Sequence, residues 1–106
     1  MEDTNRIPIP DSFMALYVRH GRPTHRQEEV EARLEFCEDL STQVAELCRT
    51  VQFSGDLSES AALRKCLDGL LTPPASVSPG EARWVMCRVA EQLEWEIPAW
   101  LTQPAD

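Results

Sequence analysis

The feature that most constrains the fold is an apolar stripe between residues 30 and 51. Apolar residues recur there at steps of three and four positions, which is the period of one face of an α-helix. The stripe consists of Val30, Leu34, Cys37, Leu40, Val44, Leu47, Cys48 and Val51. It predicts one long amphipathic helix over about residues 25–50, which would be roughly 40 Å long.

The start of this helix has its own signal. Pro23 precedes Thr24, and Gln27 follows Thr24 by three positions, which is the spacing of a capping box. Glu28 and Glu29 come next, in the first turn, where the helix dipole stabilises acidic side chains. We therefore expect Thr24 to cap the helix.

Two further amphipathic helices are predicted after the long one. The first covers about residues 58–71, with Asp56 or Ser58 as its N-cap, and ends before two consecutive prolines. The second covers about residues 79–96, with Ser78 as its N-cap, Pro79 at the first helical position and Glu81 at the third.

A short helix over about residues 11–19 is expected before these three. Asp11 or Ser12 can cap it, and Gly21 can supply the left-handed residue that follows a helix end. A strand over residues 13–18 is the alternative, but no partner strand is apparent. Four helical segments joined by short connections predict an all-α antiparallel bundle. Residues 1–106 are expected to form one domain, with flexible ends at 1–9 and 102–106.

Composition and charge exclude several classes of protein. The net charge is −8, and residues 27–46 carry seven acidic side chains against Arg33 alone, so nucleic acid is a poor partner. No apolar run approaches the ~18 residues of a membrane span. The N-terminus has acidic residues where a signal peptide has basic ones. We expect a cytoplasmic protein without membrane contact.

The sequence offers little catalytic chemistry. The four glycines are too scattered for a phosphate-binding loop or a dinucleotide fingerprint. The four cysteines form no C-x-x-C pair, so no metal or cofactor is predicted, and a reducing compartment disfavours disulfides. Small core residues are the simplest interpretation of the thiols, and a Cys–His nucleophile remains an open alternative.

A basic joint between the first two helices is the first candidate site. Arginines and histidines gather there in an otherwise acidic chain, next to the free N–H groups of a helix N-terminus. Three readings stay open: a solvated loop, an anion-binding site, or a histidine metal site. The residues proposed for anion binding are Arg19, Arg22, Thr24, His25 and Arg26.

Two further surfaces are candidates for binding a partner protein. One is the acidic outer face of the long helix, which would either keep it soluble or attract a basic partner. The other is the C-terminal tail, whose tryptophans would either cover the bundle or bind a partner. The proposed contact residues are Glu31, Glu35, Glu38, Asp39, Trp95, Ile97, Trp100 and Leu101.

The segments "IPIPDSFMALYV", "RLEFCEDLSTQV" and "LLTPPASVSPGEARWVMCRVAEQLEW" resemble a set of small proteobacterial proteins of about this length. Those proteins often carry the label "ATPase with chaperone activity". The resemblance implies chaperone or regulatory biology. The chain lacks the Gly-Lys-Ser/Thr loop that such an ATPase needs, and no functional residue can be carried over.

The sequence therefore predicts a small helical module that binds another protein, as an adaptor, regulator or chaperone accessory, and a homo-oligomer is compatible with it. The alternative is a regulatory module that senses a nucleotide or another anion at the basic joint. A Cys–His enzyme is the third class.

Overall fold

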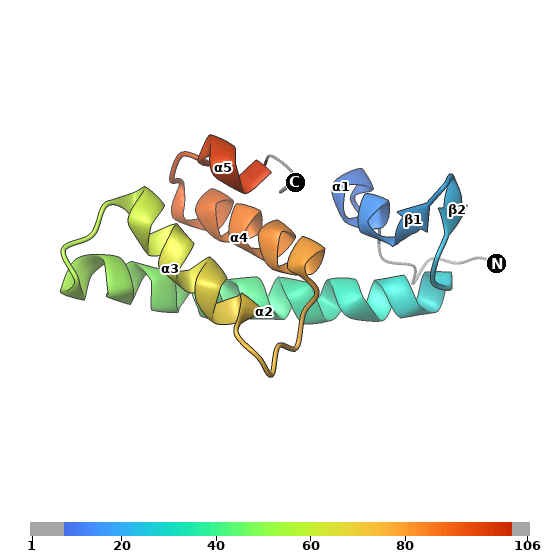
Figure 1. Cartoon of the computed structure of the whole chain (residues 1–106), viewed down its shortest axis with the longest axis horizontal. Helices are drawn as coiled ribbons and strands as arrows, with labels where there is room; N and C mark the ends of the chain where they lie inside the picture. The colour runs from blue at the N-terminus through green and yellow to red at the C-terminus, as the bar shows by residue number, and fades with distance from the viewer. Residues whose placement is uncertain (1–7, 103–106) are drawn as a thin grey trace.

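Three long helices form the body of the structure, a computed structural model that describes residues 8–102 (Figure 1). Helix α2 (Gln27–Ser54) runs along the whole length of the molecule, and α3 (Glu59–Leu71) and α4 (Pro79–Leu93) pack against it and against each other. The predicted helical bundle of three main helices is confirmed. No helix of the described part is long and apolar enough to cross a membrane.

A small N-terminal unit lies over the first turns of α2 (Figure 1). Its elements are α1 (Asp11–Met14), the 3-10 helix η1 (Ala15–Tyr17), and the antiparallel strands β1 (Val18–Arg19) and β2 (Arg22–Pro23). Phe13 anchors this unit in the core, because its fully buried ring meets the ring of Trp84 edge-on at 4.8 Å between centroids.

The predicted single helix over 11–19 is therefore too long, because its last residues form the first strand of a hairpin. His20 and Gly21 form the hairpin turn, with φ values of +55° and +76°. Two positive φ values in a two-residue turn match the twist of paired strands. Gly21 does adopt the predicted left-handed conformation, but it serves the hairpin and does not follow a helix end. The predicted flexible ends, 1–9 and 102–106, fall mostly outside the described residues.

The predicted cap of the long helix is wrong. The hydroxyl of Thr24 forms a hydrogen bond with Nδ1 of His25 at 2.9 Å and does not cap the helix. The carboxylate of Glu29 accepts the backbone N–H of Arg26 instead, at 2.9 Å. The β2 strand causes this shift, because it holds the chain extended through Pro23 and delays the first helical turn to Gln27.

The other two predicted caps are confirmed. The hydroxyl of Ser58 accepts the backbone N–H of Ala61 at 3.1 Å, so Ser58 and not Asp56 caps α3. Ser78 and Glu81 form a reciprocal capping box at the start of α4, with Pro79 at the first helical position.

Helix α4 ends at Leu93 and not at residue 96. Glu94 adopts a left-handed conformation with φ +61°, and the N–H of Trp95 reaches back to the carbonyl of Ala90 at 2.9 Å. This early turn directs the tail back over the bundle, where the short helix α5 (Ala99–Thr102) lies beside α4.

The hydrophobic core lies between the three long helices and under the N-terminal unit. Most of the predicted apolar stripe of α2 is buried there, including Val30, Leu34, Cys37 and Cys48. Leu47 departs from the prediction, with 55% of its surface exposed. The reason is geometric: α3 and α4 cover one side of α2, and the stripe extends beyond the edge of that contact.

Candidate functional site

The most extensive polar cluster in the core centres on Glu81, in the first turn of α4. The side chain of Arg33 on α2 donates two hydrogen bonds to the Glu81 carboxylate, at 3.0 Å from Nε and 2.8 Å from Nη2. The hydroxyl of Tyr17 donates a third, and the backbone N–H of Ser78 donates a fourth at 2.9 Å. Arg33 also reaches the carbonyl oxygen of Ser76 at 2.9 Å. One carboxylate thus ties together the N-terminal unit, α2, the α3–α4 loop and α4.

These contacts set the ionisation of the cluster. Burial of Glu81 opposes its negative charge, but the hydrogen bonds from Arg33, Tyr17 and Ser78 outweigh burial and lower the pKa of Glu81 to about 2. Burial and the hydrogen bond to Glu81 raise the pKa of Tyr17. Glu81 is therefore a fully ionised and fully occupied acceptor. It is well suited to hold the fold and poorly suited to exchange protons in catalysis.

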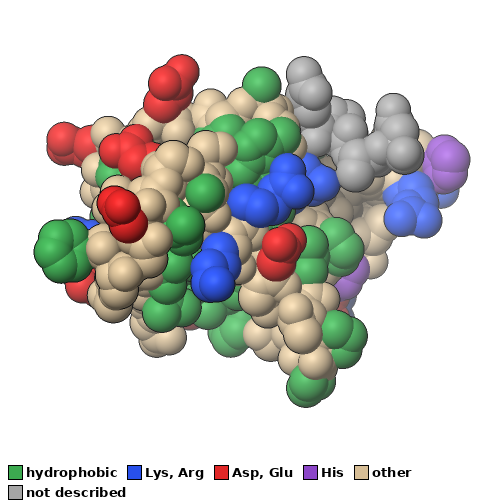
Figure 2. Space-filling view, turned by 60° about the vertical axis from the view of Figure 1, so that its left-hand side comes forward, with side chains coloured by type: hydrophobic (Ala, Val, Ile, Leu, Met, Phe, Trp, Pro, Cys, Tyr) green, Lys and Arg blue, Asp and Glu red, His purple; other side chains and the backbone are tan. Residues whose placement is uncertain are grey.

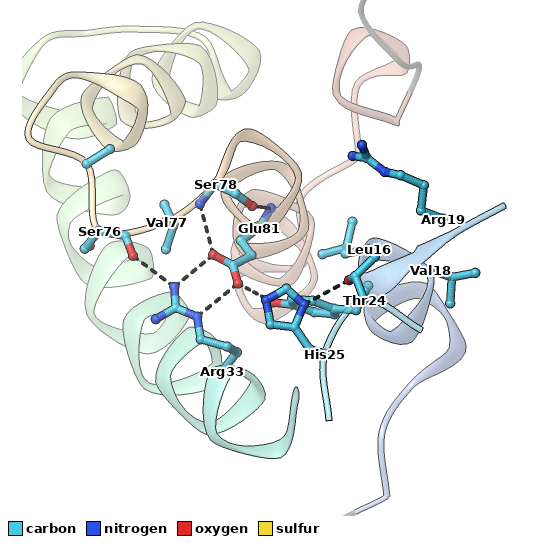
Figure 3. Close-up of a pocket in the computed structure, with 12 residues that line it drawn as sticks. Leu16, Val18, Arg19, Thr24, His25, Arg33, Ser76, Val77, Ser78 and Glu81 are labelled. Atoms are coloured by element: carbon cyan, nitrogen blue, oxygen red, sulfur yellow. Dashed lines mark hydrogen bonds and ion pairs between the residues drawn. The ribbon is translucent and has the colours of Figure 1, made fainter. Parts of the chain in front are cut away.

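A cleft of about 750 Å³ opens beside this cluster, between the hairpin and the α3–α4 loop. Figure 3 shows Thr24 and His25 at its hairpin side, close to Glu81 and Arg33, with Arg19 farther out. The ring of His25 meets the ring of Tyr17 edge-on, at 5.1 Å between centroids. The cleft thus combines exposed polar side chains with an arginine and a carboxylate that bind each other.

The structure brings together part of the predicted anion site. Arg19, Thr24 and His25 line the cleft, whereas Arg22 and Arg26 do not. Within residues 8–102, no hydrogen bond or ion pair involves the side chain of Arg19 or Arg22. The described residues also contain no group of three or more side chains able to hold a metal ion.

The face of α2 that α3 and α4 leave uncovered carries two parallel stripes. Steps of four and seven residues return to nearly the same side of an α-helix, so each stripe is continuous along the helix. The apolar stripe of this uncovered face differs from the mostly buried stripe predicted from the sequence, and consists of Phe36, Leu40, Leu47 and Val51. The acidic stripe beside it consists of Glu28, Glu35, Asp39 and Glu46.

Both stripes are available at the surface. Phe36 and Leu47 are 39% and 55% exposed, and Leu40 and Val51 are half-buried. In the described part of the chain, no ion pair or hydrogen bond engages the four side-chain carboxylates. An exposed apolar patch with a polar rim is a feature of many protein-binding surfaces.

A groove of about 360 Å³ borders the apolar stripe, where α2 meets α3. Val44, Leu47 and Val51 line it from α2, and Cys66 and Leu70 line it from α3 together with Lys65 and Gly69. Phe53, at the far end of α2, is 86% exposed. Figure 2, which brings this end of the molecule forward, shows hydrophobic side chains reaching the surface among charged ones.

The predicted acidic contact residues divide into two groups. Glu35 and Asp39 lie on the acidic stripe. Glu31 and Glu38 lie toward the covered side, where Glu31 accepts a hydrogen bond from Gln27 at 3.3 Å and Glu38 pairs with Arg88 at 3.4 Å. Glu28 and Glu46 belong to the stripe but were not among the predicted contact residues, although their spacing to Glu35 and Asp39 is visible in the sequence.

The predicted tail residues pack onto the bundle. Leu101 is 1% exposed, and Trp95, Ile97 and Trp100 are half-buried against the core. The indole N–H of Trp100 donates to the hydroxyl of Ser60 at 3.0 Å, and the guanidinium of Arg64 lies 4.3 Å from the centroid of the same ring. In this structure the tail covers the α3–α4 surface, and Trp100 keeps an exposed edge.

Sequence reasoning missed the Glu81 cluster. Glu81 was assigned to the capping box with Ser78, and that local signal accounts for only one of its contacts. Arg33 and Tyr17 come from segments 48 and 64 positions away, and nothing in a single sequence marks them as neighbours.

Comparison of the chain with protein-family models, with curated proteins and with solved structures finds no match.

Proposed function

We propose that this protein is a non-catalytic protein-binding module, and that its docking surface is the uncovered face of α2. The single observation behind this proposal is the apolar stripe lying beside the unpaired acidic stripe. An apolar surface supplies affinity through burial, and neighbouring charges guide the partner and fix its orientation.

The chemistry of the surface favours one kind of partner, a basic amphipathic helix. The apolar stripe spans residues 36–51, which corresponds to a partner helix of about 15 residues lying along α2. The apolar face of that helix would fill the α2–α3 groove at Leu47, and its basic side chains would face the acidic stripe. Lys65 lies on the opposite rim of the groove, and its positive charge would disfavour a placement in which the basic side chains of the partner face α3.

An adaptor, a regulator or a chaperone accessory would use such a surface. The chaperone role is compatible with the label of the small proteins that the sequence resembles. The ATPase half of that label receives no support from the residues of this chain, which lacks a phosphate-binding loop.

A synthetic peptide provides the test. We would measure binding of a 15-residue amphipathic Leu/Lys helix by fluorescence anisotropy, with a scrambled peptide of equal composition as the control for nonspecific charge attraction. Leu47→Asp should weaken binding by at least about tenfold, because it places a charge in the apolar contact. Ala75→Asp, at an exposed position of the α3–α4 loop away from both stripes, should bind like the wild type.

The charged half of the surface has a separate readout. Replacing Glu35, Asp39 and Glu46 with Gln, Asn and Gln should slow association and flatten its dependence on salt, since exposed charges act mainly over a screened range. Equal binding of the designed and scrambled peptides, or unchanged binding by Leu47→Asp, would contradict the proposal. So would a dimer of the free protein that Leu47→Asp dissociates, because the occupant would then be a second copy.

The cleft beside Glu81 supports a second candidate, the sensing of a small anion. Arg19 and His25 line a cleft of about 750 Å³, and Arg19 has no partner among the described residues. Inorganic phosphate and a nucleoside triphosphate are the ligands to be tested. A ligand at 100 times its Kd contributes about 2.7 kcal/mol of stability, which a thermal shift detects readily.

Arg19→Gln should remove that shift, whereas Arg49→Gln, at the far end of α2, should retain it. A shift that both variants retain, or no shift with any anion at low salt, would exclude the cleft as an anion site.

A further inference from the structure

A second cleft, of about 590 Å³, lies on α4 and is bordered by the two short helices that pack against it, α1 and α5. Trp84 and Arg88 line this cleft from α4, and Glu38 lines it from α2. Pro10, at the start of α1, and Ile97, in the tail before α5, also line it. Segments distant in the sequence therefore form the cleft, and its volume lies in the range of small-molecule sites, about 300–1,000 Å³.

Part of the cleft wall is apolar and firmly held. Trp84 is 8% exposed, and its indole N–H donates to the hydroxyl of Ser12 at 3.0 Å. The ring of Trp84 also packs edge-on against the ring of Phe13, and Ile97 packs against the same core. The cleft therefore offers a ligand a preformed apolar surface that includes one aromatic ring.

The charged groups of the cleft are two carboxylates and one guanidinium. Nη1 of Arg88 donates to Glu91 at 2.8 Å, and Nη2 of Arg88 donates to Glu38 at 3.4 Å. The side chains of Glu38 and Glu91 are 41% and 53% exposed, so both carboxylates can accept further hydrogen bonds. Among the described residues that line the cleft, one positive charge stands against two negative charges, which favours a cationic ligand over an anionic one.

Arg88 also has an unused hydrogen-bond donor. Its Nε is buried and has no partner among the described residues, and a buried donor without a partner costs free energy. The Arg88 side chain as a whole is 36% exposed, so its guanidinium can turn toward an acceptor that enters the cleft. A neutral oxygen, such as a carbonyl, would supply that acceptor without adding negative charge.

We propose that this cleft binds a small organic cation, in which a primary ammonium group and a neutral carbonyl oxygen are attached to an apolar body. The ammonium group would donate to Glu38 and Glu91. The carbonyl oxygen would accept a hydrogen bond from Arg88, and the apolar body would pack on Trp84. An amino-acid amide is the simplest compound with these three groups, and the N-terminal residue of a peptide carries the same three.

This site is separate from the proposed docking surface. None of the described residues that line the cleft belongs to the apolar stripe or the acidic stripe of α2. Leu47→Asp should therefore leave binding of the amine unchanged, and Glu38→Gln/Glu91→Gln should bind the Leu/Lys peptide like the wild type. Either proposal can thus fail without the other.

The experiment adds L-phenylalaninamide to the native protein and follows the tryptophan indole N–H signals by NMR. It is carried out at about pH 6, below the pKa of an α-amino group, so that the amine is charged. The Trp84 signal should shift with ligand concentration, whereas the signal of Trp100, which does not line the cleft, should stay in place. Trp95→Phe and Trp100→Phe identify the other two indole signals. N-acetyl-L-phenylalaninamide, which lacks the charge, should bind at least about fivefold more weakly.

Two variants test the contacts of the ammonium and carbonyl groups. Glu38→Gln/Glu91→Gln should weaken binding at least about fivefold, whereas Glu28→Gln/Glu46→Gln, which removes the same charge from the acidic stripe, should bind like the wild type. Phenethylamine, which lacks the carbonyl group, should bind the wild type several-fold more weakly than L-phenylalaninamide does. Arg88→Met should remove this difference between the two ligands.

A peptide distinguishes the two sources of this chemistry. Binding of phenylalanyl-glycyl-glycinamide as tight as that of L-phenylalaninamide would identify the ligand as a peptide N-terminus, and much weaker binding would identify it as a free small amine.

Four results would overturn the proposal. They are equal affinity for L-phenylalaninamide and its N-acetyl form, a shift of the Trp100 signal in place of the Trp84 signal, unchanged binding by Glu38→Gln/Glu91→Gln, and no shift at millimolar ligand. Circular dichroism of each variant checks that it keeps its helices.

Discussion

Arg33 and Glu81 lie 48 positions apart in the sequence and are joined by two hydrogen bonds of 3.0 and 2.8 Å. Their side chains connect the middle of the first half of α2 to the first turn of α4, and Tyr17 completes the contact from the N-terminal unit. Glu81 is 4% exposed. A buried carboxylate with this many donors is stable only while all of them stay in place, so the cluster makes the packing of three segments interdependent.

The first prediction concerns the pH dependence of stability. The native pKa of Glu81 is about 2, below the ~4.3 of an unfolded glutamate, so the unfolded state binds more protons between these values. The contribution of Glu81 is complete above about pH 5 and is lost as the pH falls toward 2. It amounts to about 3 kcal/mol, measured by urea unfolding across that range.

The variant Glu81→Gln isolates this effect. It should lose about 3–5 kcal/mol at pH 7, because Arg33 remains partly buried without its partner. The difference from wild type should shrink as the pH falls below 4. Glu46→Gln, on the exposed acidic stripe, should change stability by less than about 0.5 kcal/mol at every pH. A constant deficit of Glu81→Gln from pH 7 to pH 2 would refute the assignment.

The second prediction uses one substitution at two glycines. Gly21 has φ +76° and Gly69 lies inside α3, and a Cβ added at either site meets nothing within 4 Å. Only backbone conformation distinguishes them. Gly21→Ala should lose about 1 kcal/mol because a side chain disfavours the left-handed region. Gly69→Ala should gain about 0.5–1 kcal/mol through helix propensity. Thermal unfolding measures the change in Tm of each variant. Changes in the same direction would disprove the hairpin turn.

The third prediction concerns the tail. Trp100→Ala should cost about 2 kcal/mol, because the half-buried ring covers α3 and its N–H bonds Ser60. Arg64→Ala removes only the cation that lies over the ring, and should cost about 0.5–1 kcal/mol. The two variants are compared by the midpoints of their urea unfolding curves, which must have equal slopes (m values). Full stability of Trp100→Ala would show that the tail does not support the bundle in solution.

The fourth prediction separates core from surface with two leucines. Leu63 is fully buried and Leu47 is 55% exposed. Leu63→Ala should destabilise by about 2–5 kcal/mol through the cavity it leaves. Leu47→Ala should change the free energy of unfolding by less than about 1 kcal/mol, so its effect on peptide binding can be read without unfolding. Similar losses in the two variants would place Leu47 in the core and remove it from the docking surface.

Local signals explain which parts of the fold could be predicted. The three long helices follow from apolar periodicity, and the caps at Ser58 and Ser78 follow from short-range hydrogen bonds between neighbouring residues. The hairpin at His20 and Gly21 was missed because a four-residue ladder carries no periodicity. The cap at Thr24 was wrong for a related reason, since the strand that displaces it is defined by its partner.

The sequence by itself determined the helical class of the protein, its acidic outer surface and the scarcity of catalytic motifs, because each of these depends on residues close together in the chain. Tertiary structure decided the rest. It placed Arg33 and Tyr17 beside Glu81 and left Leu47 outside the core. These outcomes depend on how α3 and α4 are rotated and seated on α2. That arrangement comes from the summed packing of side chains distant in sequence, which no local pattern encodes.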